Sequence, residues 1–568
     1  MKLKLKTLTP VHISTGINLE PFDYLIKDEN IYRISLPKAI EVISEDVPDA
    51  PEQFAEWLDE QLFRFDSQKN NQYQQANKSQ SKIRREINFG VFCRGVLKKP
   101  ALVDKLIKSA VVYEMPLPFG MANNTQVNEQ IKSSDNLPYI PGTSIKGAVR
   151  TALAANAWLK LTDAERAKIT QNTKRSMGQF NPKRYYKDKD EELMKLIFSC
   201  RTTDNSKSDA ARFSIFKFFH FSDAHFVSAD QKDVMQANPV FLYLKDKEPQ
   251  PQTNAQEMIS AGSILEFDLF VDTDGLWRAY KESKTGTGIW LDLEMKIERL
   301  FDIKIAEIKK DELEKKLAGA MFAVLNKHAR QTFDRDLKWF DGLRYFTQKN
   351  GIAEATIKRI SNFFASGIPA DGGTLKTGWG SGFLSTTIFH SIKQTNEPFV
   401  KEMFHDLKIG EARQKGGYGD REQQSTPTNL NYFPKSRRMT AQQLLIPESV
   451  MGWIQIAEDF TTPVAVDGKT ETVETRVVEA PKVDTEAIIA GYTADNQKVK
   501  LKDMQKMYAK VLRSEAPMVV CEILHPELPG EFKARYPAGL PDGSFVILNV
   551  NFIKSGKIQN VSLAKALV

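Results

Sequence analysis

The sequence has very little cysteine. Only three cysteines, Cys93, Cys200 and Cys521, occur in 568 residues, and they are far apart, with no CxxC pair and no Cys/His cluster. This spacing argues against a disulfide framework and against a structural zinc site. We therefore expect a reducing, cytoplasmic setting, no metal and no cofactor.

Long apolar runs are also missing. No stretch reaches the roughly 18 apolar residues that a membrane span needs, so we expect no membrane partner. The first residues, "MKLKLKTLTPVHIS", alternate charged and apolar side chains, whereas a signal peptide has an unbroken apolar stretch. The alternation predicts a β-strand whose Leu3, Leu5 and Leu8 serve the core.

The charge balance is only mildly basic. Lys and Arg number 79 against 72 Asp and Glu, which gives a formal net charge of +7 and a pI of about 8.9. Such a balance permits a polyanionic partner without requiring one, so the positions of the basic residues matter more than their sum.

The length predicts several domains, because a single core stops growing at roughly 250–300 residues. Strands and helices alternate loosely, with hairpins between them, which favours an α+β fold over a doubly wound parallel sheet. We expect a polar loop at 246–258, a linker at 462–485, where aromatic residues are absent, and a small β-rich domain at 486–568. That last domain reads equally as an OB-like barrel that contacts nucleic acid and as a docking module.

The stretch "YIPGTSIKGAVR" predicts a turn that leads directly into a helix. Thr143 or Ser144 is suited to cap that helix, so plain capping is one interpretation. The other is a phosphate site, because Gly142 permits close approach, helix amides bind phosphate, and Lys146 and Arg150 share one face.

A second candidate stretch is "GWGSGF". Its alternating glycines, Gly378, Gly380 and Gly382, would present backbone amides without obstruction, and Trp379 could stack on a base. It is not a Walker A loop, since no Gly-Lys-Ser/Thr follows. A bulged turn rich in glycine is the alternative. The basic segment "FPKSRR" follows later in the chain.

These stretches, in the order "TPVHISTG", "YIPGTSIKGAVR", "EFDLFVD", "GWGSGFLSTT" and "FPKSRR", resemble the RAMP superfamily of CRISPR effector complexes. More narrowly, the chain resembles the type III-A (Csm) subunit that caps the complex at the 3′ end of the CRISPR RNA. The resemblance covers about residues 1–445. It implies two ferredoxin-like (RRM-like) domains with insertions, at 1–258 and 259–461, before the linker and the β-rich domain at 486–568.

The resemblance also implies a function and partners. The chain would be a non-catalytic subunit that binds the guide RNA and its duplex with target RNA, next to a RAMP backbone subunit and a small helical subunit. Phosphates would be gripped while the bases stay free to pair. The implied RNA-binding residues are His12, Ser14, Gly16, Gly142, Thr143, Ser144, Lys146, Arg150, Gly378, Trp379, Gly380, Ser381, Gly382, Lys435, Arg437 and Arg438.

A RAMP ribonuclease is the alternative function. His12 lies where some guide-processing RAMP enzymes carry a histidine, and Asp23 lies where backbone subunits carry an aspartate needed for target cleavage. Neither has an obvious local acid–base partner, and "EPFDY" lacks the glycines of a flexible slicing loop. Asp223 and His225 form only a weak metal signal. We therefore expect no catalytic residue.

Overall fold

The computed structural model describes two compact units, Met1–Val464 and Ala465–Val568. It describes every residue except 21, 29, 70–86, 118–126, 172–179, 203–211, 227–234, 245–246, 287, 342–357, 359, 370, 411, 414–424, 427–429, 431–432, 444–445, 461–484, 498–504, 516–517, 536–541, 553–557 and 567–568. The expected linker at 462–485 therefore lies almost wholly outside the described residues. The fold is mixed α+β, as the sequence predicted.

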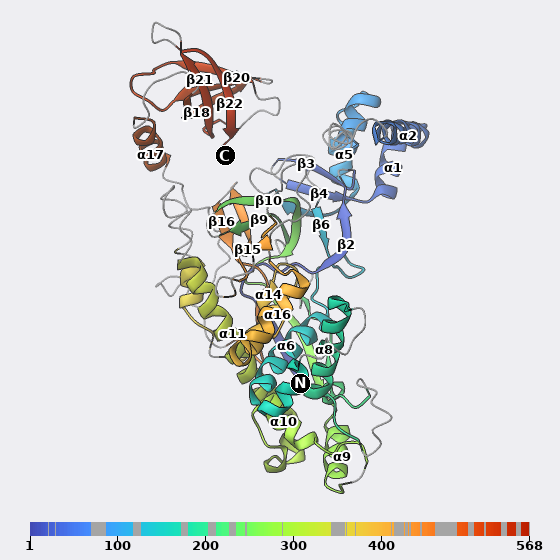
Figure 1. Cartoon of the computed structure of the whole chain (residues 1–568). Helices are drawn as coiled ribbons and strands as arrows, with labels where there is room; N and C mark the ends of the chain where they lie inside the picture. The colour runs from blue at the N-terminus through green and yellow to red at the C-terminus, as the bar shows by residue number, and fades with distance from the viewer. Residues whose placement is uncertain are drawn as a thin grey trace. The chain divides into compact units, whose positions relative to one another are not determined.

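The first sheet of the larger unit is built around the N-terminal strand, and the start of the chain is marked N in Figure 1. Its order is β12-β17-β1-β11-β7, and β8 also pairs with β11. The strands are β1 (Lys2–Thr7), β7 (Phe219–Phe221), β8 (His225–Phe226), β11 (Ile264–Val271), β12 (Gly373–Lys376) and β17 (Trp453–Ala457). The strand expected at the N-terminus is thus confirmed.

Two long helices cover one face of this sheet. Helix α6 (Gly142–Lys160) and helix α11 (Leu313–Asp341) contact each other and strand β12. The alternation in β1 buries Leu3 and Leu5 in the same core as Ile145 and Val149 of α6. In chain order the elements β1, α6, β7, β11, α11 and β12 alternate as in a split βαβ unit.

The second sheet has the order β16-β15-β9-β10-β6-β2. Its strands are β2 (Ser14–Leu19), β6 (Val127–Gln130), β9 (Met235–Leu244), β10 (Lys247–Ile259), β15 (Ser436–Gln443) and β16 (Ile446–Ser449). The polar loop expected at 246–258 was wrong, because strand β10 pairs there with β9 and β6. Both sheets take strands from either side of residue 258.

A small layer lies between β2 and β6 in the sequence. Its three-stranded sheet consists of β3 (Tyr24–Lys27), β4 (Asn30–Ile34) and β5 (Val111–Pro116), and it shares a hydrophobic core with helices that lie between β4 and β5 in the sequence. The helices are α1 (Leu36–Ser44), α2 (Ala50–Lys69), α4 (Phe89–Val91) and α5 (Leu102–Ser109), with the π-helix η1 (Phe92–Val96).

The larger unit contains further elements, several of which contact α6. They are α7 (Asp163–Thr170), α8 (Pro182–Phe198), η3 (Ile215–Phe218), α9 (Thr273–Ser283), α10 (Leu293–Phe301), η4 (Ile305–Glu307), η5 (Lys310–Glu312), α14 (Phe383–Thr386), α15 (Phe389–Thr395), α16 (Glu397–Leu407), β13 (Ala412–Arg413) and β14 (Ser425–Thr426). A capping box formed by Thr162 and Glu165 opens α7.

The second unit is a five-stranded antiparallel sheet of order β20-β19-β18-β21-β22. It contains α17 (Thr485–Gln497), β18 (Gln505–Glu515), β19 (Met518–Ile523), β20 (Glu531–Arg535), β21 (Phe545–Phe552) and β22 (Ile558–Ala566). The edge strands β20 and β22 also contact each other, so the sheet curls on itself, and this strand order is that of an OB-type barrel. Both readings of its role stay predictions.

Candidate nucleic-acid interface

Two loops far apart in sequence meet at the end of the first sheet. We call residues 10–16 and 377–382 the loop cluster. Hydrogen bonds of 2.8 Å run from the Thr377 amide to the Gly452 carbonyl, from the Gly452 amide to the Pro10 carbonyl, and from the Trp379 amide to the His12 carbonyl. The structure therefore brings together two of the stretches that the sequence singled out.

The glycines of the loop cluster are required by the backbone. Gly378, Gly380 and Gly382 have φ values of 81°, 81° and 83°, in the left-handed region that favours glycine. A Cβ on Gly378 would lie 2.6 Å from the His12 carbonyl oxygen. The amides of Gly380 and Gly382 make no hydrogen bond to any residue that the structure describes. Ser381 between them is buried.

Trp379 and Arg438 form a stacked pair beside these amides. The ring of Trp379 packs on Met258 and Met451, and the Arg438 guanidinium carbon lies 4.9 Å from the ring centroid. Arg438 is exposed on strand β15, so its charge faces solvent. A planar cation over an aromatic ring, next to open amides, suits a phosphate and an adjacent base.

His12 is buried beneath the loop cluster rather than presented on it. It is 1% exposed, its Nδ1 lies 2.6 Å from the Glu257 carbonyl oxygen, and its ring meets Trp379 edge-on. Burial lowers the pKa of His12 to about 4, although the bond to Glu257 opposes this. The ring is therefore neutral at physiological pH, and Nδ1 donates to the carbonyl. Among the predicted residues after it, Ser14 and Gly16 are exposed, with the Gly16 amide bonded to the Ser14 hydroxyl at 3.0 Å.

A buried polar network that the sequence did not reveal holds the loop at residues 10–16. The Glu257 carboxylate is fully buried and accepts from Tyr113 Oη at 2.6 Å, Lys132 Nζ at 2.6 Å and the Gln130 amide at 2.9 Å. Gln130 Oε1 in turn accepts from the Ile13 amide at 2.7 Å. These residues lie more than a hundred positions from Ile13 or Glu257, so no local pattern signals them.

The start of α6 is capped by a distant carboxylate. The Gly142 amide donates to Asp223 Oδ1 at 2.7 Å, and a Cβ on Gly142 would lie 2.2 Å from the Phe221 carbonyl oxygen. Neither Thr143 nor Ser144 caps the helix, because Pro141 is the N-cap residue and makes no side-chain bond. The capping expected from those hydroxyls was therefore wrong. The carboxylate of Asp223 already occupies one position where a phosphate was expected.

The two basic residues of α6 lie over aromatic rings. Lys146 Nζ donates to the Phe219 carbonyl at 2.6 Å and lies 5.2 Å from the Phe216 centroid, and burial lowers its pKa. Arg150 is exposed, 5.0 Å from the Phe198 centroid. Both line a cavity of about 750 Å³ along α8 together with Thr143. The helix start meets the loop cluster through Ser144, whose carbonyl accepts from Thr377 Oγ1 at 3.3 Å.

The basic segment after Pro434 divides between surface and core. Lys435 is exposed, with Nζ 3.5 Å from the Gly410 carbonyl oxygen. Arg437 pairs through Nε with the buried Asp336 at 2.7 Å. Of the three cations predicted here, Arg438 alone contacts the described loop cluster.

The residues considered for catalysis are tied into the fold. Asp23 accepts from the Glu20 amide at 2.8 Å and from Arg33 Nη1 at 3.2 Å, so it closes a turn, and burial raises its pKa. His225 stacks on Tyr139, 5.2 Å away. Among the described residues no group of three or more His, Cys, Asp or Glu is placed to hold a metal ion.

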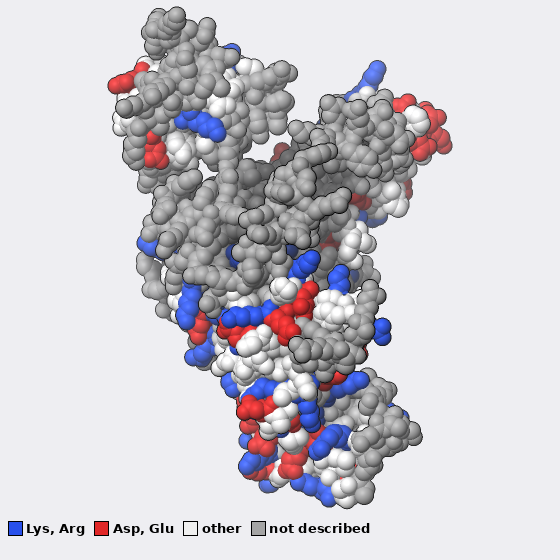
Figure 2. All heavy atoms as spheres, viewed as in Figure 1, with Lys and Arg blue, Asp and Glu red and all other residues white. Residues whose placement is uncertain are grey.

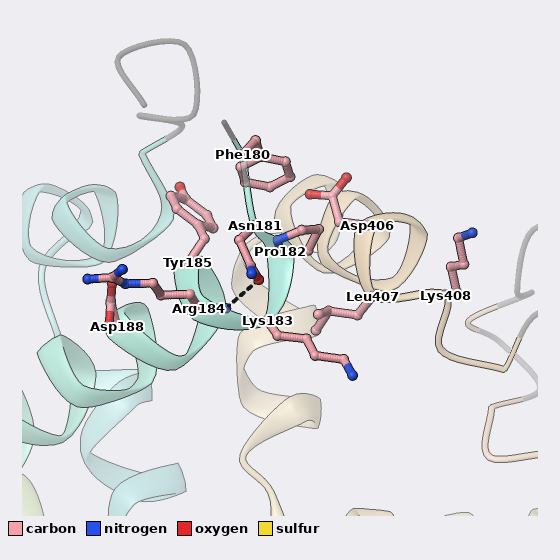
Figure 3. A pocket seen from close by; sticks show the side chains of 10 residues that line it. All are labelled: Phe180, Asn181, Pro182, Lys183, Arg184, Tyr185, Asp188, Asp406, Leu407 and Lys408. Atoms are coloured by element: carbon pink, nitrogen blue, oxygen red, sulfur yellow. Dashed lines mark hydrogen bonds between the residues drawn. The ribbon is translucent and has the colours of Figure 1, made fainter. Parts of the chain in front are cut away.

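Overall surface charge does not locate the site. On the described part of the face in Figure 2, Lys and Arg lie among Asp and Glu. A hollow of about 730 Å³ lies between the start of α8 and the end of α16, and its lining side chains, drawn in Figure 3, include Lys183, Arg184 and Lys408. It contains none of the residues predicted from the sequence, so these cations serve as a reference for the loop cluster.

Comparisons with known proteins agree with the motifs. The family described as "RAMPs: RAMP superfamily" matches residues 4–385, a span that includes both loops and α6. The fold is similar to a chain of the cryo-EM Csm–crRNA–target RNA ternary complex of a type III-A CRISPR-Cas system, with TM-score 0.47 and 18% identity over 80% of this chain and 100% of that one. It is also similar to the crystal structure of T. onnurineus Csm5, with TM-score 0.46 and 18% identity over 80% and 99%.

No curated protein matches the sequence. Within the described residues, every helix is too short or too polar to cross a membrane.

Proposed function

Because the chain belongs to the RAMP superfamily, we propose that it is a guide-RNA-binding subunit of a type III CRISPR effector ribonucleoprotein. The loop cluster holds phosphates of the guide, and the subunit ends the filament at the guide 3′ end. Its partners are the guide RNA, the target strand paired to it, a RAMP backbone subunit and a small helical subunit.

One observation carries this proposal. The Trp379 amide bonds the His12 carbonyl, which places the open amides of Gly380 and Gly382 and the exposed Arg438 at one point of the surface. Backbone amides and a guanidinium recognise phosphate without reading bases. A guide must keep its bases free for pairing, so this chemistry fits a guide-holding subunit.

We further propose that the subunit does not cut RNA. The His12 ring is buried and neutral, and the Asp23 carboxylate is engaged by the Glu20 amide and Arg33. A general acid or base has to reach the reacting hydroxyl, and neither group is free to do so. An assembled complex with Asp23→Asn should cleave target RNA at every site that the wild type cleaves. Loss of one cleavage site with assembly intact would favour a slicing role.

The loop cluster is tested by removing Arg438. Arg438→Ala should weaken binding of single-stranded RNA about tenfold, because one charged contact of about 1.5 kcal/mol is lost. Lys183→Ala is the control, since Lys183 is also exposed but lies at the hollow of Figure 3. The slope of log Kd against log salt should fall by about 0.7 in Arg438→Ala alone. Equal losses in both variants would show that only net charge matters.

A further inference from the structure

A second group of cations lies where β12, α11 and β15 approach one another, beside the loop cluster in sequence. Lys376 ends β12, and Arg335 and Arg437 come from α11 and β15. Asp336, which is 2% exposed, pairs with Arg437 at 2.7 Å, and Lys376 and Arg335 both lie near enough to interact electrostatically with this carboxylate. Three positive charges therefore face one negative charge.

Within the described part of the chain, two of these cations are not held in an ion pair. Neither Lys376 nor Arg335 forms an ion pair or hydrogen bond with any described residue. Burial lowers the pKa of Lys376, and the nearby Arg437 lowers it further, against the attraction of Asp336. Burial and Arg437 lower the pKa of Arg335 in the same way. Lys376 and Arg335 are half-buried, and cations held partly out of water with no ion pair among the described residues weaken a fold, so this cluster favours the arrival of an anion.

Two tryptophan rings next to the cluster have indole N–H groups without a described hydrogen-bond acceptor. Lys376 Nζ lies 5.4 Å from the centroid of Trp453, and the Arg437 guanidinium carbon lies 5.0 Å from that of Trp339. Both indoles are buried, 1% and 7% exposed, and neither Nε1 has a hydrogen-bond partner among the described residues. An indole N–H can only donate. The region is therefore rich in unpaired donors and poor in acceptors.

We propose that Arg335, Lys376 and Arg437 form a phosphate-binding site distinct from the loop cluster. A phosphate group brings several acceptor oxygens and the negative charge that the cluster lacks. Lys376 is two residues from Gly378, so a phosphate of bound RNA is one source, and a free phosphate compound is the other. This inference goes beyond the proposed function, because the loop cluster can hold a guide whether or not this site is filled.

The test uses Lys376→Met in the full-length chain, with Lys316→Met as a control for charge. Lys316 is exposed on the same helix as Arg335 and forms no ion pair with a described residue. The probes are a mixed-sequence single-stranded RNA and sodium phosphate, the latter compared with sodium chloride at equal ionic strength. The measurements are the melting temperature with and without each probe, and the Kd for RNA.

Lys376→Met should melt a few degrees higher than the wild type without any probe, because a half-buried cation that has no ion pair with a described residue has gone. It should also lose most of the stabilisation that a probe gives the wild type. If RNA supplies the phosphate, the Kd for RNA rises about tenfold; if a free compound does, only the response to sodium phosphate is lost. Arg335→Met should behave alike, and Lys316→Met like the wild type.

A Lys376→Met protein that melts lower than the wild type without probes, or that keeps its full response to both probes, would overturn the site. Neither result would contradict the proposal for the loop cluster, because that proposal is tested separately with Arg438→Ala. Failure of Arg438→Ala to weaken RNA binding, with Lys376→Met behaving as expected, would instead remove the proposed function and leave the phosphate site.

Discussion

The two glycine-bearing stretches look alike in the sequence and differ in the structure. The sequence predicts, in both 142–146 and 378–382, backbone amides that are available to a phosphate. At 378–382 the amides of Gly380 and Gly382 stay open among the described residues, whereas the Gly142 amide donates to Asp223. The same residue type can thus serve a ligand at one site and packing at the other. Only the environment contributed by distant segments decides between them.

The largest loss of stability should come from Gly378, because among the glycines of 378–382 it leaves the least room for a side chain. Gly378→Ala should destabilise the protein by about 4 kcal/mol, because φ is left-handed and the new Cβ would lie 2.6 Å from the His12 carbonyl, breaking its bond to Trp379. Gly382→Ala has a similar φ, but the nearest atom is 4.0 Å away, so about 1 kcal/mol is expected. Urea unfolding measures both. Equal losses of unfolding free energy in the two variants would mean that only backbone strain matters and that the contact with His12 does not hold the loop in place.

His12, which is buried beneath the loop cluster, should make the free energy of unfolding depend on pH. The folded-state pKa of His12 is about 4, below its usual 6.5, so the folded protein binds fewer protons than the unfolded chain. Its contribution, on the order of 3 kcal/mol, is present above pH 6.5 and is lost as the pH falls towards 4. His328 and His390 have similarly lowered pKa values, so the comparison needs His12→Asn, whose amide can still donate to Glu257.

Unfolding free energies at pH 7 and pH 4.5 should therefore differ less in His12→Asn than in the wild type. An unchanged difference would mean that His12 titrates normally and is accessible to solvent. That outcome would reopen a catalytic role for this histidine.

The smallest effect concerns the capped stretch. Asp223→Ala should cost about 1–2 kcal/mol of stability, since the Gly142 amide loses its acceptor, and Asp223→Asn should restore most of it. RNA affinity at fixed salt should not fall in either variant, because the Asp223 carboxylate caps helix α6 and is not expected to contact RNA. A tenfold weaker Kd in Asp223→Ala, with Asp223→Asn at wild-type affinity, would place the start of α6 in the interface after all.

Local patterns predicted the elements and missed what depends on distant contacts. The alternation in "KLKLKT" and the turn into a helix at "YIPGTSIKGAVR" were read correctly, because each is determined within a few residues. The polar segment at 246–258 was misread as a loop, because its pairing with β9 and β6 decides that it is a strand.

The candidate site shows the same limit. The glycine loop and Arg438 could be predicted from the residues and the family resemblance, but their meeting at Trp379 could not. Arg437 has the same charge as its neighbour and points instead to Asp336, because successive side chains of a strand alternate in direction. The support from Glu257 and Lys132 leaves no pattern in the sequence, since each partner sits in a different strand or loop.

The pairing of β1 also has a consequence for synthesis of the chain. Strand β1 contains residues 2–7 and pairs on one side with β11, but its other neighbour, β17, begins only at Trp453. The glycine loop is likewise held in place by hydrogen bonds that involve Gly452, which bonds to both Pro10 and Thr377. A ribosome adding about 5–20 residues per second therefore spends tens of seconds between making the first and last parts of this surface. The loop cluster is therefore complete only after Gly452 has emerged, and under the proposed function assembly with a guide follows translation of nearly the whole larger unit.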